Sequence, residues 1–287
     1  MDAADTFVAE ERDGILSGPV RRPVNVSRAA EGSIHDDGTA QALGFRGGTV
    51  AGNIHMEQFP PLMVARFGSA WWRTGGLSLH FLHATTDGEP VQAFVGRPES
   101  GAVPRAEAWM ETPEGVRVCE GTAWLGGDDP NSALRLKLAA ARPAAELRIL
   151  ASAQVGDEVR DVPSRLDSGP ALVRLDGVTE PLPEYRADKV AAPAVAIDAL
   201  RAVEAPLFRS QGEFVGLFGA IELQFLAGPV FLDRDYLADG RVVGLSESPK
   251  TEIAWYESVL READGGRPIA RLLMMSRLLK ASSPLWG

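Results

Sequence analysis

The chain is poor in reactive side chains. It has 287 residues with one cysteine, Cys119, and four histidines, all of which lie between His35 and His83. A single cysteine excludes an intrachain disulfide, which fits a reducing compartment. Cys119 stands between Val118 and Glu120 in a segment typical of a strand, where we expect it to pack rather than to act as a nucleophile.

The chain has fewer basic than acidic residues. Twenty-nine Lys and Arg against 39 Asp and Glu give a net charge of −10. This balance argues against nucleic acid or an anionic membrane as a partner, because both favour clustered basic residues. It does not exclude a local basic patch for a phosphorylated ligand, for which Arg66, Arg73, Arg97 and Arg105 are candidates. Scattered, solvated arginines are the alternative interpretation.

Signals for targeting, membrane insertion and metal binding are also missing. The acidic N-terminus has no apolar segment of a signal peptide. The most apolar stretch, residues 215–232, is interrupted by Glu222, Gln224 and Pro229 and favours buried strand. The chain has no His-x-x-x-His or Cys-x-x-Cys spacing, no glycine-rich phosphate loop and no Gly-x-Ser-x-Gly elbow. We therefore expect a cytoplasmic protein without a metal or cofactor.

The sequence contains an internal repeat. Residues 76–82 (GLSLHFL) resemble residues 220–226 (AIELQFL) at an offset of 220 − 76 = 144, and Trp109 matches Trp255 at 255 − 109 = 146. An offset near half the chain indicates a duplicated domain. We place the boundary between residues 1–130 and 131–287. Only the first half contains histidine, so we expect it to contribute most of the site and the second half to contribute shape.

Hydrophobic periodicity and turn residues predict one long helix followed by antiparallel strands in each half. The helices are expected at residues 49–67, broken or kinked at Pro60-Pro61, and at 195–208. Val50, Ile54, Met56, Leu62, Met63 and Phe67 would form the apolar surface of the first. A short helix is expected at 36–43 and a linking helix at 132–141, after a poorly ordered lead-in at 1–22. The strands are expected at 77–84, 91–95, 105–112, 116–125, 220–226, 241–246, 252–260 and 269–280.

Residues 31–54 carry a recognisable motif. His35, then Asp37, a short helix, Gly47-Gly48 and Val50-Ala51 resemble the corresponding segment of MaoC-type (R)-specific enoyl-CoA hydratases of the hotdog superfamily. The resemblance implies an α+β fold of two tandem hotdog domains, each a long helix wrapped by a curved antiparallel sheet. Together they would form a double hotdog with one continuous sheet.

The resemblance also implies the chemistry. The substrate would be an acyl-CoA or acyl-carrier thioester with a bulky acyl group, and the reaction its hydration or dehydration. His35 would be the base, since an imidazole titrates near neutral pH. Glu31 or Asp37 would be the conditional acid. Amides around Gly48, Thr49 and Val50 would polarise the thioester carbonyl, and Asn53, His55 and His80 would line the acyl groove.

The motif departs from the family pattern Asp-x-Asn-Pro-x-His. Ala30 stands where the family has its aspartate, Gly32 and Ser33 replace the Asn-Pro pair, and Gly52 replaces a second histidine. Two alternatives therefore stay open. One is other thioester chemistry on the same fold, such as hydrolysis, isomerisation or cyclisation. The other is a non-catalytic binder or assembly subunit.

Single residues also have structural interpretations. His35 could cap the short helix, and His55 could be a core histidine with satisfied hydrogen bonds. His80 and His83 are three residues apart in a strand, so they point to opposite faces. Residues 277–286 mix basic and apolar side chains and are expected to dock on the body or form a subunit contact. We expect a homodimer.

Overall fold

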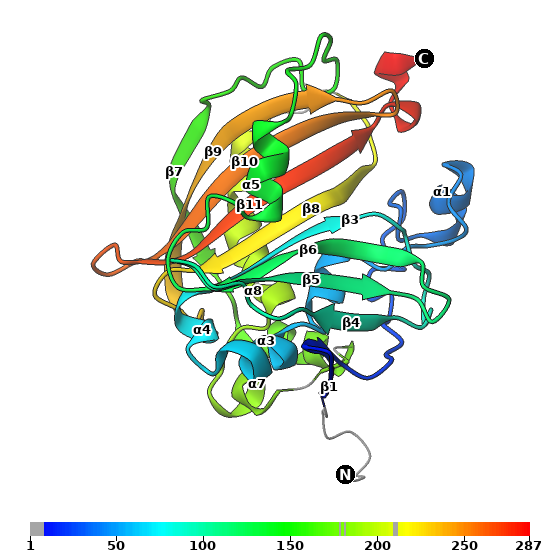
Figure 1. Ribbon diagram of the computed structural model, residues 1–287. Helices are drawn as coiled ribbons and strands as arrows, with labels where there is room; N and C mark the ends of the chain where they lie inside the picture. The colour runs from blue at the N-terminus through cyan, green and yellow to red at the C-terminus, as the bar shows by residue number, and fades with distance from the viewer. Residues whose placement is uncertain (1–8, 178, 181, 209–211) are drawn as a thin grey trace.

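The computed structural model describes residues 9–177, 179–180, 182–208 and 212–287. In these residues eleven strands form one antiparallel sheet in the order β1-β2-β4-β5-β6-β3-β8-β11-β10-β9-β7 (Figure 1). The first half contributes β1 (Glu10–Arg12), β2 (Ile15–Ser17), β3 (Gly75–Phe81), β4 (Gln92–Val95), β5 (Arg105–Glu111) and β6 (Arg117–Leu125). The second half contributes β7 (Glu158–Arg165), β8 (Gly216–Phe225), β9 (Asp235–Glu247), β10 (Thr251–Glu262) and β11 (Pro268–Leu279).

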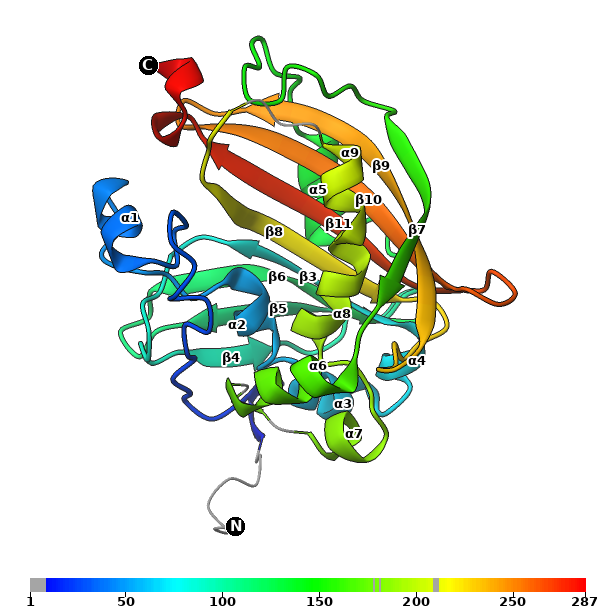
Figure 2. The same cartoon turned by 180° about the vertical axis from the view of Figure 1, so that it is seen from behind.

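The helices lie on both faces of this sheet. Figure 2 shows α2 (Gly52–Met56), α3 (Pro60–Phe67), α8 (Pro193–Leu200) and α9 (Glu204–Leu207) on the inner face, where the 3₁₀ turn η2 (Arg201–Val203) joins α8 to α9. The outer face carries α5 (Ala133–Ala139) (Figure 1). The remaining helices are α1 (Asp37–Ala42), α4 (Trp71–Thr74), α6 (Ser168–Arg174) and α7 (Pro183–Ala187).

The two halves meet at the pairing of β3 with β8. Ser78 lies directly opposite Glu222, and 222 − 78 = 144 is the offset of the sequence repeat. Each of these residues is therefore the repeat counterpart of the other, as expected on a local two-fold axis. The strand order on one side of this pair mirrors the order on the other, so the predicted duplication and the continuous sheet are confirmed.

The prolines break the first long helix, as predicted. Pro60 begins the separate helix α3, where a missing N–H costs least. The predicted start at residue 49 is wrong, because Thr49 and Val50 precede α2 and bond to other segments. The N–H of Thr49 donates to the Ile34 carbonyl (2.8 Å) and that of Val50 to the Thr85 carbonyl (2.9 Å).

The local sequence pattern did not predict several other strands and helices. The lead-in was expected to be poorly ordered, yet β1 and β2 form a hairpin and Leu16 pairs with Val95 on β4. Residues 1–8 of the same expectation lie outside the described residues. Helices α6 and α7 were not expected either. The predicted linking helix is confirmed as α5, whose N-cap Ser132 accepts from the Arg135 N–H (3.4 Å).

One continuous core fills the space between the sheet and the inner helices. Leu77 and Leu79 of β3 and Ile221 and Leu223 of β8 point inward onto side chains of α2 and α3, including Met56, Leu62 and Met63. Burial of each such side chain stabilises the fold by roughly 1.5–3 kcal/mol. Cys119 belongs to this core, and its burial raises the pKa of the thiol well above its usual range. It is a packing residue, as expected.

Candidate functional site

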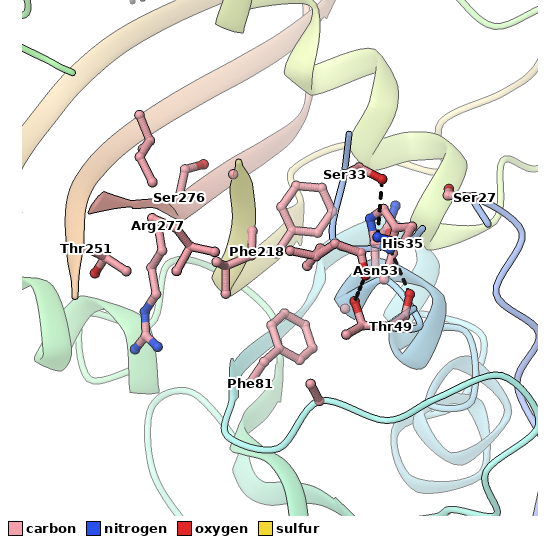
Figure 3. A pocket seen from close by; sticks show the side chains of 18 of the residues that line it. Ser27, Ser33, His35, Thr49, Asn53, Phe81, Phe218, Thr251, Ser276 and Arg277 are labelled. Carbon is pink, nitrogen blue, oxygen red and sulfur yellow. Dashed lines mark hydrogen bonds between the residues drawn. The ribbon is translucent and has the colours of Figure 1, made fainter. Parts of the chain in front are cut away.

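A cavity of about 1470 Å³ lies where the two halves meet. Its walls come from α2, from η2 and α9, and from the ends of β8 and β11. Figure 3 shows His35, Ser33, Thr49 and Asn53 grouped together, Thr251, Ser276 and Arg277 apart from them, and the rings of Phe81 and Phe218 between. Of the 38 lining residues, 21 belong to residues 131–287. The expectation that the first half contributes most of the site is therefore wrong.

His35 is held with one ring nitrogen free. Its backbone N–H donates to Ser33 Oγ (3.2 Å), its carbonyl accepts from Asn25 Nδ2 (2.8 Å), and its Nδ1 lies 2.7 Å from the Thr49 carbonyl oxygen. A carbonyl oxygen can only accept, so Nδ1 carries a proton, and Nε2 has no partner among the described residues. The alternative that His35 caps the short helix is wrong, because Asp36 accepts from the Thr39 N–H (2.9 Å).

Neither predicted acid lies on the cavity wall. Glu31 is exposed on the preceding loop and is not among the lining residues. Asp37 is not among them either, and its Oδ1 accepts from the Gly48 N–H at 2.7 Å. This bond fixes the Gly47-Gly48 turn against the start of α1. Of the predicted catalytic residues, the structure brings only His35 to the cavity.

The three amides predicted to bind a carbonyl oxygen are already occupied. Gly48 donates to Asp37, and Thr49 and Val50 donate to the carbonyls of Ile34 and Thr85. That assignment is therefore wrong, although Thr49 and Val50 do line the cavity while Gly48 does not.

The next amides along the chain are open. In the part of the chain that the structure describes, the N–H groups of Gly52 and Asn53 at the start of α2 have no acceptor. Both residues line the cavity. Gly52 also lets α2 approach β3, since a Cβ there would lie 2.6 Å from Phe81 Cε2. The sequence signal was present, because Gly52 stands where the family has a histidine.

Two side chains of α2 carry buried polar atoms without a partner. Asn53 Oδ1 and His55 Nδ1 have none within the described residues, although the side chains are only 4% and 2% exposed. His55 Nε2 lies 2.7 Å from Thr85 Oγ1, and burial lowers the pKa of His55 to about 4, so the ring is neutral at pH 7. Buried polar atoms without a partner mark places where a ligand or water can bind. Both residues line the cavity, as predicted.

The second half adds a chain of ion pairs that the sequence did not indicate. Arg174 of α6 pairs with Asp198 of α8, Arg201 of η2 pairs with Glu204 of α9 (2.6 Å), and the Tyr256 hydroxyl donates to Glu204 (2.6 Å). Except for Tyr256, these side chains line the cavity. The expectation that this half contributes only shape is wrong. Its carboxylates already have partners within the protein.

His80 lies on the other side of the sheet. It shares the outer face of β3 with Ser78, whose Oγ accepts from the Leu134 N–H of α5 (3.0 Å), and it is not among the lining residues. The prediction that His80 lines the acyl groove is therefore wrong, because strand alternation directs it away. His83 is half-buried beside Arg46, with Nε2 3.0 Å from the guanidinium.

Two negative findings apply to the described ranges only. No group of three or more His, Cys, Asp or Glu side chains there is arranged to hold a metal ion. None of the described helices has both the length and the hydropathy of a bilayer span.

Comparisons with known proteins bear on the fold. No family model matches the chain, and no curated protein matches its sequence. The solved structures that match almost throughout include the following three. A MaoC domain protein dehydratase from Chloroflexus aurantiacus J-10-fl is 12% identical over 96% of this chain and 94% of its own, with a TM-score of 0.61. A MaoC-like dehydratase is 16% identical over 92% and 97%, with a TM-score of 0.54.

The third structure is a conserved hypothetical protein from Mycobacterium tuberculosis, described as having a double hotdog fold. It is 11% identical over 91% of this chain and 93% of its own, with a TM-score of 0.59. These likenesses establish the double hotdog fold of the present chain and confirm the fold predicted from the motif.

Proposed function

We propose that this double hotdog protein is an enoyl-thioester hydratase or dehydratase of the MaoC type, with His35 as general base. The observation that carries the proposal is the free Nε2 of His35 on the wall of a cavity that also holds the open amides of Gly52 and Asn53. A base for an acidic C–H bond and donors for a developing oxyanion are the two elements that thioester α-carbon chemistry requires.

One base is sufficient for the reaction. In dehydration, His35 Nε2 removes the α-proton, and the electron pair of the C–H bond forms an enolate. The amides of Gly52 and Asn53 stabilise the enolate oxygen. Collapse of the enolate forms the α,β double bond and breaks the β-carbon–oxygen bond, and the imidazolium returns its proton to the departing hydroxide, which leaves as water. Hydration is the reverse, and the proton and hydroxyl add to the same face.

The substrate is a thioester with a bulky acyl group, carried by coenzyme A or by an acyl carrier. The size of the cavity and its aromatic wall support this choice. Phe81, Phe208, Phe214 and Phe218 line the cavity, and contact with their rings favours an extended or polycyclic chain.

The test is turnover of a series of enoyl thioesters, from crotonyl to long-chain and polycyclic. The purified protein is expected to add 18 daltons to at least one member, with the deuterium from D₂O on the same face as the hydroxyl. His35→Gln is expected to lower kcat roughly 10²- to 10⁴-fold while substrate binding persists.

Glu31→Gln is the matched control, because it lies on the same loop with its side chain exposed. It is expected to turn over like the parent protein. Full activity of a folded His35→Gln protein would contradict the role of His35, and loss of activity in Glu31→Gln would return the acid role to that residue.

Thioester hydrolysis is the second candidate. It is favoured because both carboxylates among the described lining residues, Asp198 and Glu204, are held in ion pairs. Here His35 would deprotonate water for attack on the carbonyl carbon, and the same two amides would stabilise the tetrahedral oxyanion. Release of free thiol without an 18-dalton adduct would identify hydrolysis. Tight binding with neither product, unchanged in His35→Gln, would identify a non-catalytic binder.

A further inference from the structure

Arg277 occupies an unusual position on β11. The β8–β11 register shifts between Met275 and Ser276, so Gly219 of β8 is an extra residue at a bulge. A Cβ on Gly219 would lie 2.2 Å from Met275 Cε and 2.9 Å from Arg277 Nε. The bulged glycine therefore makes room for the arginine side chain, and bulges often direct a side chain toward a functional site.

The Arg277 guanidinium has no counter-ion. Within the described residues no carboxylate pairs with it, its Nε is buried without a partner, and burial lowers the pKa of the group. Its contact is with His80, whose Nε2 lies 3.3 Å from Nη2. Burial, Lys137 and Arg277 lower the pKa of His80 to about 4, so the ring is neutral and accepts from the guanidinium.

Arg271, on the same strand, has the carboxylate partner that Arg277 lacks among the described residues. It is six residues away on the same outer face, and its guanidinium pairs with Asp128 at 2.8 Å. A partly buried charge that lacks such a partner is costly to keep. Arg277 thus carries a positive charge that an incoming anion can satisfy. Lys137 of α5 adds a second cation near His80 and likewise has no ion pair among the described residues.

The site adjoins the cavity through a gap in the sheet. Pairing between β3 and β8 begins at His80 and Ala220, so residues 216–219 of β8 have no partner on β3. Both sides of the gap line the cavity: Leu82 and His83 after β3, and Gly216 and Leu217 on β8. Arg277 lies opposite Leu217 and is itself a lining residue.

We infer that Arg277 binds the phosphate at the end of the pantetheine arm of the thioester carrier. The inference rests on the proposed function. The guanidinium offers two parallel N–H donors to one phosphate. His80 is a positioning residue that orients the guanidinium without neutralising it. The same phosphate occurs in coenzyme A and in a phosphopantetheinylated carrier protein.

The experiment tests three arginine variants against a series of carriers for one acyl group. The carriers are N-acetylcysteamine, pantetheine, 4′-phosphopantetheine, coenzyme A and a phosphopantetheinylated carrier protein. Arg277→Gln is expected to raise KM roughly tenfold to a hundredfold for the three phosphorylated carriers and to leave the other two unchanged. Arg271→Gln, the matched control, is expected to leave all five unchanged. Arg277→Lys is expected to fall between them.

Equal effects of Arg277→Gln on pantetheine and 4′-phosphopantetheine esters would overturn the inference. So would an effect confined to coenzyme A, which would place the anion at the nucleotide end. Calorimetry with free pantetheine and 4′-phosphopantetheine separates this inference from the proposed function. Suppose that no thioester is turned over but Arg277→Gln weakens the binding of 4′-phosphopantetheine and not that of pantetheine. The proposed reaction is then contradicted, and the anion site is supported.

Discussion

The inner helices of the two halves begin at nearby places in the repeat, at Gly52 and Pro193 (193 − 52 = 141), but their first amides differ. The start of α2 is open, with the amides of Gly52 and Asn53 on the cavity wall. The start of α8 is closed, because the Ala194 N–H donates to the buried carboxyl of Glu57 from the first half. A carboxyl group at a helix start satisfies an amide that a ligand would otherwise use. One helix start is thus open to the cavity, and the other joins the halves.

The outer faces differ in the same way. Trp255 of β10 is buried under α5, where it packs with Leu134 and Met275. Its counterpart Trp109 on β5 has no such cover, and its ring stacks on Phe94 (5.3 Å between centroids). The linking helix thus covers Trp255 of the second half but not its counterpart in the first. Equivalent positions are therefore expected to differ in their contribution to stability.

The largest expected effect concerns these two tryptophans. Trp255→Ala removes a side chain that is 2% exposed and is expected to lower the free energy of unfolding by roughly 3–5 kcal/mol. Trp109→Ala loses one stacked ring and is expected to cost about 1 kcal/mol. Urea unfolding of both variants measures the difference. Equal costs would show that α5 does not stabilise the second half selectively.

A smaller difference in the free energy of unfolding is expected between variants of Glu222 and Ser78, which face each other at the local two-fold axis. Glu222 is buried, accepts from Ser132 Oγ (2.5 Å) and pairs with Arg135 (3.2 Å), both belonging to α5 or its cap. Glu222→Ala removes the acceptor of Ser132 Oγ and one of the two carboxylates that pair with Arg135, the other being Glu257 (3.3 Å), and is expected to cost about 3 kcal/mol. Ser78→Ala loses the bond from Leu134 and is expected to cost about 1 kcal/mol.

The double variant sharpens this test, because both residues hold the same helix. A combined cost clearly below the sum of the single costs, measured by urea unfolding, is expected. Strict additivity would contradict a shared role in docking α5.

The smallest effect is a pH dependence that originates in Glu57. Burial raises the pKa of this carboxyl from 4.5 to about 8, while its bond from Ala194 and the charge of Arg174 oppose the rise. The folded protein therefore binds this proton more tightly than the unfolded chain does. Its contribution to stability is complete below pH 4.5 and is lost as the pH rises toward 8.

Glu57→Gln keeps an acceptor for Ala194 and cannot ionise. It is expected to be more stable than the parent protein at pH 8 and to differ little from it at pH 4.5. Thermal unfolding across this range gives the comparison. A difference that does not change with pH would show that Glu57 ionises in the folded protein as it does in the unfolded chain.

The sequence by itself determined the repeated architecture and one residue of the cavity wall. Alternating apolar residues specified the strands, Pro60-Pro61 broke the first helix, and the repeat offset of 144 placed Ser78 opposite Glu222. The segment around His35 resembled a known motif closely enough to identify the imidazole on the cavity wall. These features depend on neighbouring residues along the chain, which periodicity and turn chemistry describe well.

Only the tertiary structure decided which polar groups are free. Gly48, Thr49 and Val50 lost their assigned role because Asp37, Ile34 and Thr85 occupy their amides. His80 points to the outer face of the sheet, because strand alternation places it opposite the residues that face the helices. The bulge at Gly219 makes room for the Arg277 side chain. Glu57 closes a helix start 137 residues away along the chain. Whether a donor or a charge keeps its partner depends on the packing of distant segments, and no local pattern encodes that.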